Sequence, residues 1–244
     1  MIFSKNLNFG GGTSLKAAFK TILFDVDDTL LDFSENEDQA LTKTFSKLNH
    51  RFSSKDRQQY KSYNQHLWQQ YENGVISRNY LLQTRFKSFF KQEFNEDINN
   101  EQVTKIFLNF LAQGHQKIQG AAQLLADLRM AGCHLFVASN GLPAVQRQRL
   151  QAAGLLQYFQ ALFVSGKIGY QKPVKEFFET AFQQIPAFDR QTAMIVGDSL
   201  SSDIKGGLNA GIKTVWFNPR HIKNPTAIRP DYEIADLIDL EKVV

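Results

Sequence analysis

Five short segments of the chain are almost continuously apolar and rich in β-branched or aromatic side chains. Such runs are typical of strands in a parallel sheet that is covered on both faces, because neither side of the strand meets water. The segments cover residues 21–26, 134–139, 161–165, 193–197 and 213–217.

Helical patterns alternate with the last four of these segments. We expect helices over residues 142–153, over 174–184, where Pro173 would open the helix, and over 202–210, where Gly211 would end it. Regular alternation of strands and helices predicts an α/β fold with a doubly wound parallel sheet.

The interval between the first and second segments has a different pattern. Residues 35–116 contain no β-like run, and their apolar positions recur with a helical period, for example over 60–68. The interval is long enough for four helices. We therefore predict an inserted, all-helical cap over residues 35–116. The α/β core would comprise residues 19–34 and 117–244, and residues 1–18 would form an N-terminal extension outside it.

Composition places the chain among globular proteins, with 244 residues of which 43% are hydrophobic and 21% charged. A chain of this length buries a sizeable core without disulfides. The single cysteine, Cys133, excludes an internal disulfide and any metal site built from several cysteines. The first twenty residues lack the pattern of a signal peptide and no apolar run is long enough to span a membrane, so we expect a cytoplasmic protein.

The net charge of +4 arises from basic residues that are scattered among acidic and amide side chains. A nucleic-acid-binding protein usually concentrates its basic residues on one stripe. We therefore expect neither nucleic acid nor a membrane as a partner. The expected partner is a small anionic metabolite, bound by a monomer or a small homo-oligomer.

The first apolar segment leads directly into Asp25-Val26-Asp27-Asp28-Thr29. Alternate residues of a strand point the same way, so Asp25 and Asp27 would face one site while Asp28 is turned away. A helix N-cap explains one aspartate after a strand, but it explains two at positions i and i+2 poorly. Two carboxylates this close repel each other unless a cation lies between them or one is protonated.

Polar residues also follow three other segments: Ser139-Asn140, Lys172, and the pair Asp198 and Asp203. Each has an ordinary interpretation, as a turn, a solvated lysine or, for Asp203, a helix N-cap. In open α/β sheets, however, ligands bind beyond the carboxyl ends of the strands. Together, a hydroxyl, an amide, a cation and carboxylates at one edge predict a site for an oxyanion.

The order of these four strand ends resembles the haloacid dehalogenase superfamily of phosphohydrolases, and the helical insert is similar to that superfamily's C1 cap. The positions that match its motifs are Asp25, Asp27 and Thr29 in the first, Ser139 in the second, Lys172 in the third, and Gly197, Asp198 and Asp203 in the fourth. The segments around Asp25 and Lys172, with Gly74-x-Ile76-x-Arg78 in the insert, also resemble the branch that dephosphorylates nucleoside 5′-monophosphates, often pyrimidine ones.

The resemblance implies Mg²⁺ as the cofactor, bound by the Asp25 carboxylate, the Asp27 backbone carbonyl and Asp198. It implies that Asp25 is the nucleophile that forms an aspartyl-phosphate. Asp27 would protonate the leaving alcohol and then accept a proton from the hydrolytic water. Lys172 would neutralise charge in the transition state.

The same resemblance assigns the remaining core positions. Ser139, Asn140 and Lys172 would bind the phosphoryl oxygens. Asp203 would orient Lys172 or the water molecules around the metal. A phosphomonoesterase acting on nucleoside 5′-monophosphates, most of them pyrimidine nucleotides, is the function that these roles imply.

Substrate choice would reside in the cap, where six residues are candidates. Aromatic residues at helical spacing belong more often to a core than to a ligand platform, so we expect about two of the six to touch substrate. The aromatic candidates, which could stack on a base, and the two arginines, which could contact sugar or base edges, are Phe33, Tyr63, Trp68, Tyr71, Arg78 and Arg85.

Two other functions stay open. A sugar-phosphate phosphatase or a phosphomutase would share the same core, and its reaction products would distinguish it. A non-catalytic binding module is a more distant alternative, since no motif residue is lost. Dehalogenation is disfavoured, because the dehalogenases of this superfamily lack the aspartate found here as Asp27.

Overall fold

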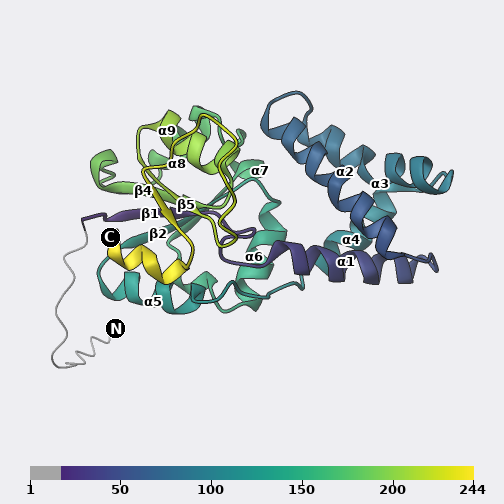
Figure 1. Cartoon of the computed structure of the whole chain (residues 1–244), viewed down its shortest axis with the longest axis horizontal. Helices are drawn as coiled ribbons and strands as arrows, with labels where there is room; N and C mark the ends of the chain where they lie inside the picture. Colours follow the sequence, from purple (N-terminus) through teal and green to yellow (C-terminus); the bar gives the residue numbers. More distant parts are fainter. Residues whose placement is uncertain (1–17) are drawn as a thin grey trace, which may run out of the picture.

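The structure is a computed structural model that describes residues 18–244. Most of the predicted N-terminal extension, residues 1–17, lies outside the described residues. Six parallel strands form one sheet in the order β3-β2-β1-β4-β5-β6 (Figure 1). The strands are β1 (Thr21–Phe24), β2 (His134–Ser139), β3 (Ala161–Val164), β4 (Ala193–Gly197), β5 (Lys213–Phe217) and β6 (Tyr232–Ile234).

The central position of β1 brings three polar strand ends together. Phe24, its last residue, lies beside Val137 of β2 and Val196 of β4. The residues that follow these three strands therefore meet at one edge of the sheet. The predicted parallel sheet is confirmed, with β6 as an additional strand. Two of the three β6 residues are exposed, so the sequence there lacks the apolar run that marks the other strands.

Each face of the sheet packs against its own helices, because successive strand residues point to opposite sides. Ile22 and Phe24 pack with α5 (Ala121–Met130) and the 3₁₀ segment η4 (Leu237–Lys242). Leu23 packs on the other face with α8 (Lys175–Phe182) and α9 (Lys205–Ala210). Figure 1 shows α5 on one side of the strands and α8 and α9 on the other.

The predicted core helices are present, with shifted ends. Residues 142–153 form α6 (Pro143–Ala152), and 174–184 contain α8. Pro173 does not open α8, because Val174 is the N-cap and the helix begins one residue later. A π-helical turn, η3 (Leu200–Ile204), precedes α9, and Gly211 ends it with a φ of 70°. The remaining short elements are η1 (Leu156–Tyr158), α7 (Ser165–Ile168) and η2 (Arg190–Thr192).

Four helices occupy the long interval between β1 and α5. They are α1 (Phe33–Lys47), α2 (Ser54–Glu72), α3 (Arg78–Phe94) and α4 (Asn100–Leu111), and they lie to one side of the sheet (Figure 1). Each begins at a polar N-cap side chain that accepts a backbone hydrogen bond: Asp32, Ser53, Ser77 and Asn99. The fold class, with its inserted helices, is confirmed. The domain boundaries at residues 34/35 and 116/117 stay a prediction, and α1 itself begins at Phe33.

A cluster of phenylalanine side chains holds the four cap helices together. Phe45 of α1 stacks on Phe90 of α3 with ring centroids 5.1 Å apart, and Phe86 of α3 meets Phe107 of α4 at 5.3 Å. All four side chains are buried. The cap thus has an apolar core of its own, separate from the two cores that flank the sheet.

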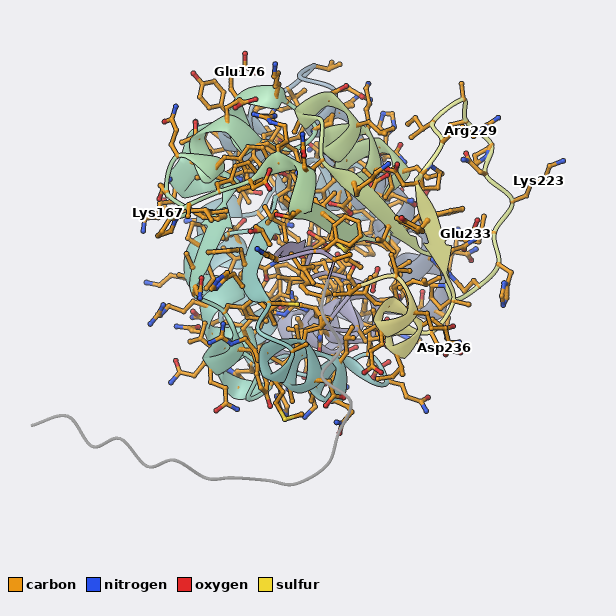
Figure 2. The ribbon with its side chains drawn as sticks, turned by 90° about the vertical axis from the view of Figure 1, so that its left-hand side faces the viewer. Lys167, Glu176, Lys223, Arg229, Glu233 and Asp236 are labelled. Carbon is orange, nitrogen blue, oxygen red and sulfur yellow. The ribbon has the colours of Figure 1, made fainter. Side chains whose placement is uncertain are left out.

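Charged side chains of both signs occur around the outer surface of the α/β core. Figure 2 shows Lys167, Glu176, Lys223, Arg229 and Glu233 pointing outward from different elements, and all five are exposed. Among residues 18–244, no helix combines the length and the apolar character needed to cross a membrane.

Replacement of a cap phenylalanine tests the independence of the cap core. Phe90→Ala is expected to lower the free energy of unfolding by about 3–5 kcal/mol, because it leaves a cavity among packed rings. Tyr80→Ala on the same helix is the control, since Tyr80 is 52% exposed and should change stability by less than about 1 kcal/mol. Urea unfolding of both variants measures the loss in free energy of unfolding. Equal losses in the two variants would contradict a packed core at Phe90.

Candidate active site

A cavity of about 390 Å³ lies between the cap helices and the carboxyl ends of the central strands. Asp25, Ser139 and Asp198 contribute to its wall from the ends of β1, β2 and β4. Helices α1, α2, α3 and α4 contribute the opposite wall. The polar strand ends that the sequence singled out therefore open into one cavity.

A buried lysine organises the polar end of this cavity. The Lys172 side chain is 1% exposed, and its Nζ donates hydrogen bonds to Asp25 Oδ1 and Asp203 Oδ1, both at 2.6 Å. A third donor reaches the backbone carbonyl of Ala138 at 2.5 Å. These contacts use all three ammonium protons, and the flanking carboxylates raise the pKa of Lys172 despite its burial. Lys172 is therefore a fixed positive charge.

Negative charge at this end exceeds the charge that Lys172 supplies. Oxygen atoms of Asp25, Asp198 and Asp203 lie within 4.8 Å of one another. Loss of hydration raises the pKa of Asp25 to about 8, although Lys172 opposes the shift, and it raises the pKa of Asp198 well above its usual value. When all three carboxyl groups are ionised, they and the ammonium carry two net negative charges, which a bound divalent cation would neutralise. Oxygen ligands of this kind suit Mg²⁺.

The structure adds one carboxylate to the two that the sequence indicated as metal ligands. Asp203 joins Asp25 and Asp198, whereas the Asp27 carboxylate is not part of the group. The backbone carbonyl of Asp27 was the predicted ligand, and that ligand stays a prediction. The residues present thus fit a divalent cation.

The Asp27 carboxylate is held by two residues of α6. Gln146 Nε2 donates to its Oδ2 at 2.7 Å, and Arg149 Nη1 forms an ion pair with its Oδ1. Gln146 also donates to Ser139 Oγ at 2.9 Å. A Cβ on Gly141 would lie 2.6 Å from Gln146 Nε2, so glycine is required there. Neither residue was among the sequence-based candidates; the signal for them was their i, i+3 spacing in the helix that follows Ser139-Asn140-Gly141.

Other residues of the first motif have local roles. Asp28 was predicted to turn away from the site, but it lines the same cavity as Asp25 and Asp27; its Oδ1 accepts from the backbone N–H of Phe33 at 2.9 Å, because Asp28 caps the start of α1. Thr29 Oγ1 accepts from the backbone N–H of Asp198 at 3.1 Å. Trp216 is buried and donates from its indole to the Asp198 carbonyl at 2.8 Å. Two side chains thus hold the Asp198 backbone in place.

The predicted phosphate-binding residues also have partners within the protein. The Asn140 side chain accepts from the Lys172 backbone N–H at 2.8 Å and donates to the Lys172 carbonyl at 3.0 Å. Asn140 thereby fixes the loop that presents Lys172. Asp203 contacts Lys172, as the resemblance implied, and its second oxygen accepts from the Ser199 N–H at 3.1 Å. A Cβ on Gly197 would lie 2.2 Å from Asp203 Oδ2, so this approach requires glycine.

The structure divides the six cap candidates into two groups. Phe33, Trp68 and Arg85 line the cavity. The others have contacts outside it: Tyr63 packs against Phe89, the Arg78 guanidinium lies over the Tyr71 ring at 5.4 Å, and Arg78 donates to the Asn140 carbonyl at 3.0 Å. Arg78 therefore connects the cap to the sheet. Contact with substrate stays a prediction for all six.

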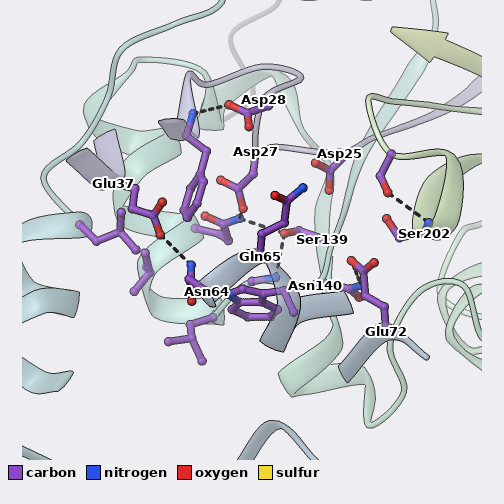
Figure 3. Close-up of a pocket in the computed structure, with 18 of the residues that line it drawn as sticks. Asp25, Asp27, Asp28, Glu37, Asn64, Gln65, Glu72, Ser139, Asn140 and Ser202 are labelled. Atoms are coloured by element: carbon purple, nitrogen blue, oxygen red, sulfur yellow. Dashed lines mark hydrogen bonds between the residues drawn. The ribbon is translucent and has the colours of Figure 1, made fainter. Parts of the chain in front are cut away.

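Several cap residues of the cavity were absent from the sequence-based candidates, among them Glu37, Asn64 and Glu72. Glu37 Oε1 accepts from Asn64 Nδ2 at 2.7 Å, and burial raises the pKa of Glu37 to about 7 (Figure 3). Burial also raises the pKa of Glu72 to about 7, and Glu72 Oε2 accepts from Ser201 Oγ at 3.3 Å. Isolated polar residues on amphipathic helices give no sequence signal, because solvated side chains have the same pattern.

Comparisons with known proteins agree with this geometry. The model of the haloacid dehalogenase-like hydrolase family matches residues 19–211. The chain is 39% identical over 226 residues to the HAD-hydrolase YfnB of Bacillus subtilis, covering 93% of this chain and 95% of that protein. The crystal structure of YfnB bound to magnesium has a TM-score of 0.87 and 38% identity, and covers 92% of this chain and 98% of that one.

Two further relatives carry a named activity. The pyrimidine 5′-nucleotidase PynA of Streptococcus pneumoniae is 39% identical, over 91% of this chain and 93% of that protein. The pyrimidine 5′-nucleotidase YjjG of Escherichia coli is 33% identical, over 91% of this chain and 96% of that protein.

Removal of the buried ammonium should destabilise the protein in a pH-dependent manner. Lys172→Ala leaves Asp25 and Asp203 without their cation, and loss of one partner of a buried ion pair costs about 3–5 kcal/mol. The cost should be larger at pH 8 than at pH 5, because a buried carboxyl with a raised pKa takes up a proton as the pH falls and the uncompensated charge disappears. Urea unfolding in metal-free buffer at both pH values measures it.

The matched control for this experiment is Lys175→Ala. Lys175 lies three residues further on, its side chain is 61% exposed, and its contact with Glu179 spans 3.9 Å. Its loss should change stability by less than about 1 kcal/mol at either pH. A Lys172 variant as stable as this control would show that the ion pairs do not hold the site together.

Proposed function

Because the chain belongs to the haloacid dehalogenase-like hydrolases and its enzyme class is that of the phosphoric monoester hydrolases, we propose that it hydrolyses nucleoside 5′-monophosphates, with pyrimidine nucleotides preferred. The observation that carries this proposal is the arrangement of Asp25, Lys172 and Asp198 at one end of a cavity with room for more than a phosphate. The two pyrimidine 5′-nucleotidases among its relatives support the choice of substrate.

Asp25 would be the nucleophile. Burial raises the pKa of Asp25 to about 8, and Lys172, bound to one of its oxygens, opposes that shift; the other oxygen is left for attack on phosphorus. The new bond joins this oxygen to phosphorus, and the bond from phosphorus to the leaving alcohol breaks. Ser139 would contact a phosphoryl oxygen. Lys172, whose three ammonium protons are bound within the protein, would supply positive charge nearby as negative charge builds up on the phosphoryl group.

Asp27 would transfer the protons. It donates one to the departing alcohol oxygen, and it then accepts one from the water that attacks the aspartyl-phosphate. That attack releases inorganic phosphate and restores the Asp25 carboxylate. Gln146 and Arg149 hold one carboxylate oxygen each, so the orientation of Asp27 is set by α6.

Mg²⁺, when bound, supplies positive charge that allows an anionic carboxylate to approach an anionic phosphate. Asp25, Asp198 and Asp203 would hold it, together with the Asp27 backbone carbonyl. The excess of two negative charges among the buried groups is the observation that favours a divalent ion.

Phosphate release from a panel of substrates tests the proposal. With Mg²⁺ present, pyrimidine 5′-monophosphates should be hydrolysed faster than sugar phosphates, and Asp25→Asn or a chelator should abolish release. Release from sugar phosphates alone would retain the chemistry and contradict the nucleotidase assignment. An isomeric phosphate as the product would indicate a mutase, and no turnover of any substrate would indicate a binding role.

Proton transfer by Asp27 has its own test. Asp27→Asn should lower kcat for a pyrimidine 5′-monophosphate by about 10²–10⁴-fold, because the amide cannot deliver a proton. The variant should unfold at a lower temperature than the wild type, because the buried Arg149 loses its charged partner, so kcat is measured well below that temperature. Asp32→Asn is the matched control. Asparagine caps helix α1 as well as aspartate does, so kcat should equal the wild-type value. A fully active Asp27→Asn enzyme would exclude this role.

A further inference from the structure

Three buried polar side chains of the cap line the cavity without a part in the proposed chemistry. Glu37 of α1, Asn64 of α2 and Arg85 of α3 are 5%, 3% and 3% exposed. We refer to them as the cap polar cluster. Burial of polar groups is unfavourable unless hydrogen bonds compensate, so three such residues at one place need a reason.

Contacts within the cap polar cluster satisfy it only in part. Asn64 Nδ2 donates to Glu37 Oε1 at 2.7 Å, and Arg85 Nη1 donates to Asn64 Oδ1 at 3.5 Å. Arg85 Nε and Nη2 have no hydrogen-bond partner. Among the side chains that the structure describes, none donates to Glu37 Oε2, and Asn64 Nδ2 has a second proton to give. The second carboxylate oxygen of Glu37 and the second N–H of Asn64 therefore lie close together, and each can make a further hydrogen bond.

The Arg85 guanidinium is fixed behind this pair. Its central carbon lies 4.9 Å from the Phe86 ring centroid and 4.8 Å from that of Phe107. Arg85 also favours the charged form of Glu37 and so opposes the effect of burial. The cluster is thus an acceptor–donor pair that a buried cation orients and balances in charge.

The position of the cluster in the cavity indicates what it could contact. In Figure 3, Glu37 and Asn64 lie at one side of the pocket, Asp25 and Ser202 at the other, and Asp27 between them. Apolar side chains line the same cavity, among them Phe33, Trp68, Leu82 and Leu108. A ligand with its phosphate at Asp25 would have a flat, apolar body against these side chains and a polar edge at the cap polar cluster.

We propose that the cap polar cluster binds the edge of a nucleobase that presents an N–H beside a carbonyl oxygen, as uracil and thymine do. This inference rests on the proposed function. Glu37 Oε2 accepts from the ring N–H, and Asn64 Nδ2 donates to the carbonyl, while Arg85 acts as a positioning residue for both. Cytosine has the same size, but it presents a bare ring nitrogen beside an amino group. It would therefore leave Glu37 opposite an acceptor.

The ratio of activities on UMP and CMP tests this inference. The wild-type enzyme should favour UMP in kcat/KM by at least about tenfold, since the mismatched edge leaves a charged group without its hydrogen bond. Glu37→Gln should lower kcat/KM for UMP by about 10–100-fold, mainly through KM, and bring the UMP/CMP ratio close to one. Its effect on ribose 5-phosphate, which has no base, should be several-fold smaller.

A matched variant distinguishes the effect of losing the Glu37 hydrogen bond from the effect of removing one negative charge from α1. Glu35→Gln makes the same substitution on the exposed side of that helix, two residues away. The Glu35→Gln enzyme should retain the wild-type UMP/CMP ratio. Asn64→Asp, which removes the donor to the carbonyl, should lower the ratio in the same direction as Glu37→Gln. It provides a second route to the result if one variant folds poorly.

Inhibition by nucleosides measures base binding without phosphate transfer. With p-nitrophenyl phosphate as the reporter substrate, uridine should inhibit the wild-type enzyme more strongly than cytidine. Glu37→Gln should raise the inhibition constant for uridine by about tenfold. If the enzyme hydrolyses no nucleotide, the proposed function fails. Uridine inhibition that depends on Glu37 would then support the cluster as a base site, and its absence would exclude it.

Two results would overturn the inference while the proposed function stands. One is an unchanged UMP/CMP ratio in Glu37→Gln. The other is an equal loss of activity on UMP, CMP and ribose 5-phosphate together with a lower melting temperature, which would assign the cluster a purely structural role.

Discussion

The buried ammonium of Lys172 is the constraint on which the active-site end of the molecule depends. It holds Asp25 from the end of β1 and Asp203 from the turn after β4, and so joins segments far apart in the sequence. Asn140, from the end of β2, forms hydrogen bonds with both the backbone N–H and the backbone carbonyl of Lys172. Three strand ends are thereby connected through one side chain, and none of their charges could stay buried alone. The close approach of Asp203 in turn requires glycine at position 197.

The cavity above this centre is closed by a domain with its own apolar core, to which Val145 of α6 also contributes, and polar contacts connect the two as well. Arg78 and Glu72 of the cap reach Asn140 and Ser201 of the core, while Arg149 of the core donates to the carbonyl of Gly114 at 3.3 Å. Polar contacts of this kind can be exchanged at small cost, unlike the packed phenylalanine cluster inside the cap. A cap that packs around its own core and is linked to the sheet partly by such contacts is suited to open and close over a substrate.

The two ends of the cavity differ in how they recognise a ligand. At the sheet, charge dominates: carboxylates and an ammonium suit a metal ion and a phosphate, whatever the rest of the substrate is. At the cap, Glu37 and Asn64 offer directional hydrogen bonds among apolar side chains. This division would let the phosphate end keep one chemistry while cap residues choose the substrate.

The sequence alone determined most of the core site. Asp25, Ser139, Lys172 and Asp198 could be assigned because each follows an apolar run, and parallel strands place their carboxyl ends at one edge whatever their order. Strand β6 was not predicted because its residues are largely exposed. The start of α8 was misplaced because proline precedes many helix starts.

The tertiary structure decided what periodicity cannot express: which face of each cap helix turns toward the sheet. That choice placed Arg85 in the cavity and Arg78 outside it, and it brought Glu37 of α1 beside Asn64 of α2. It also paired Asp27 with Arg149, 122 positions away. Such pairings depend on the packing of whole helices, and local sequence carries no record of them.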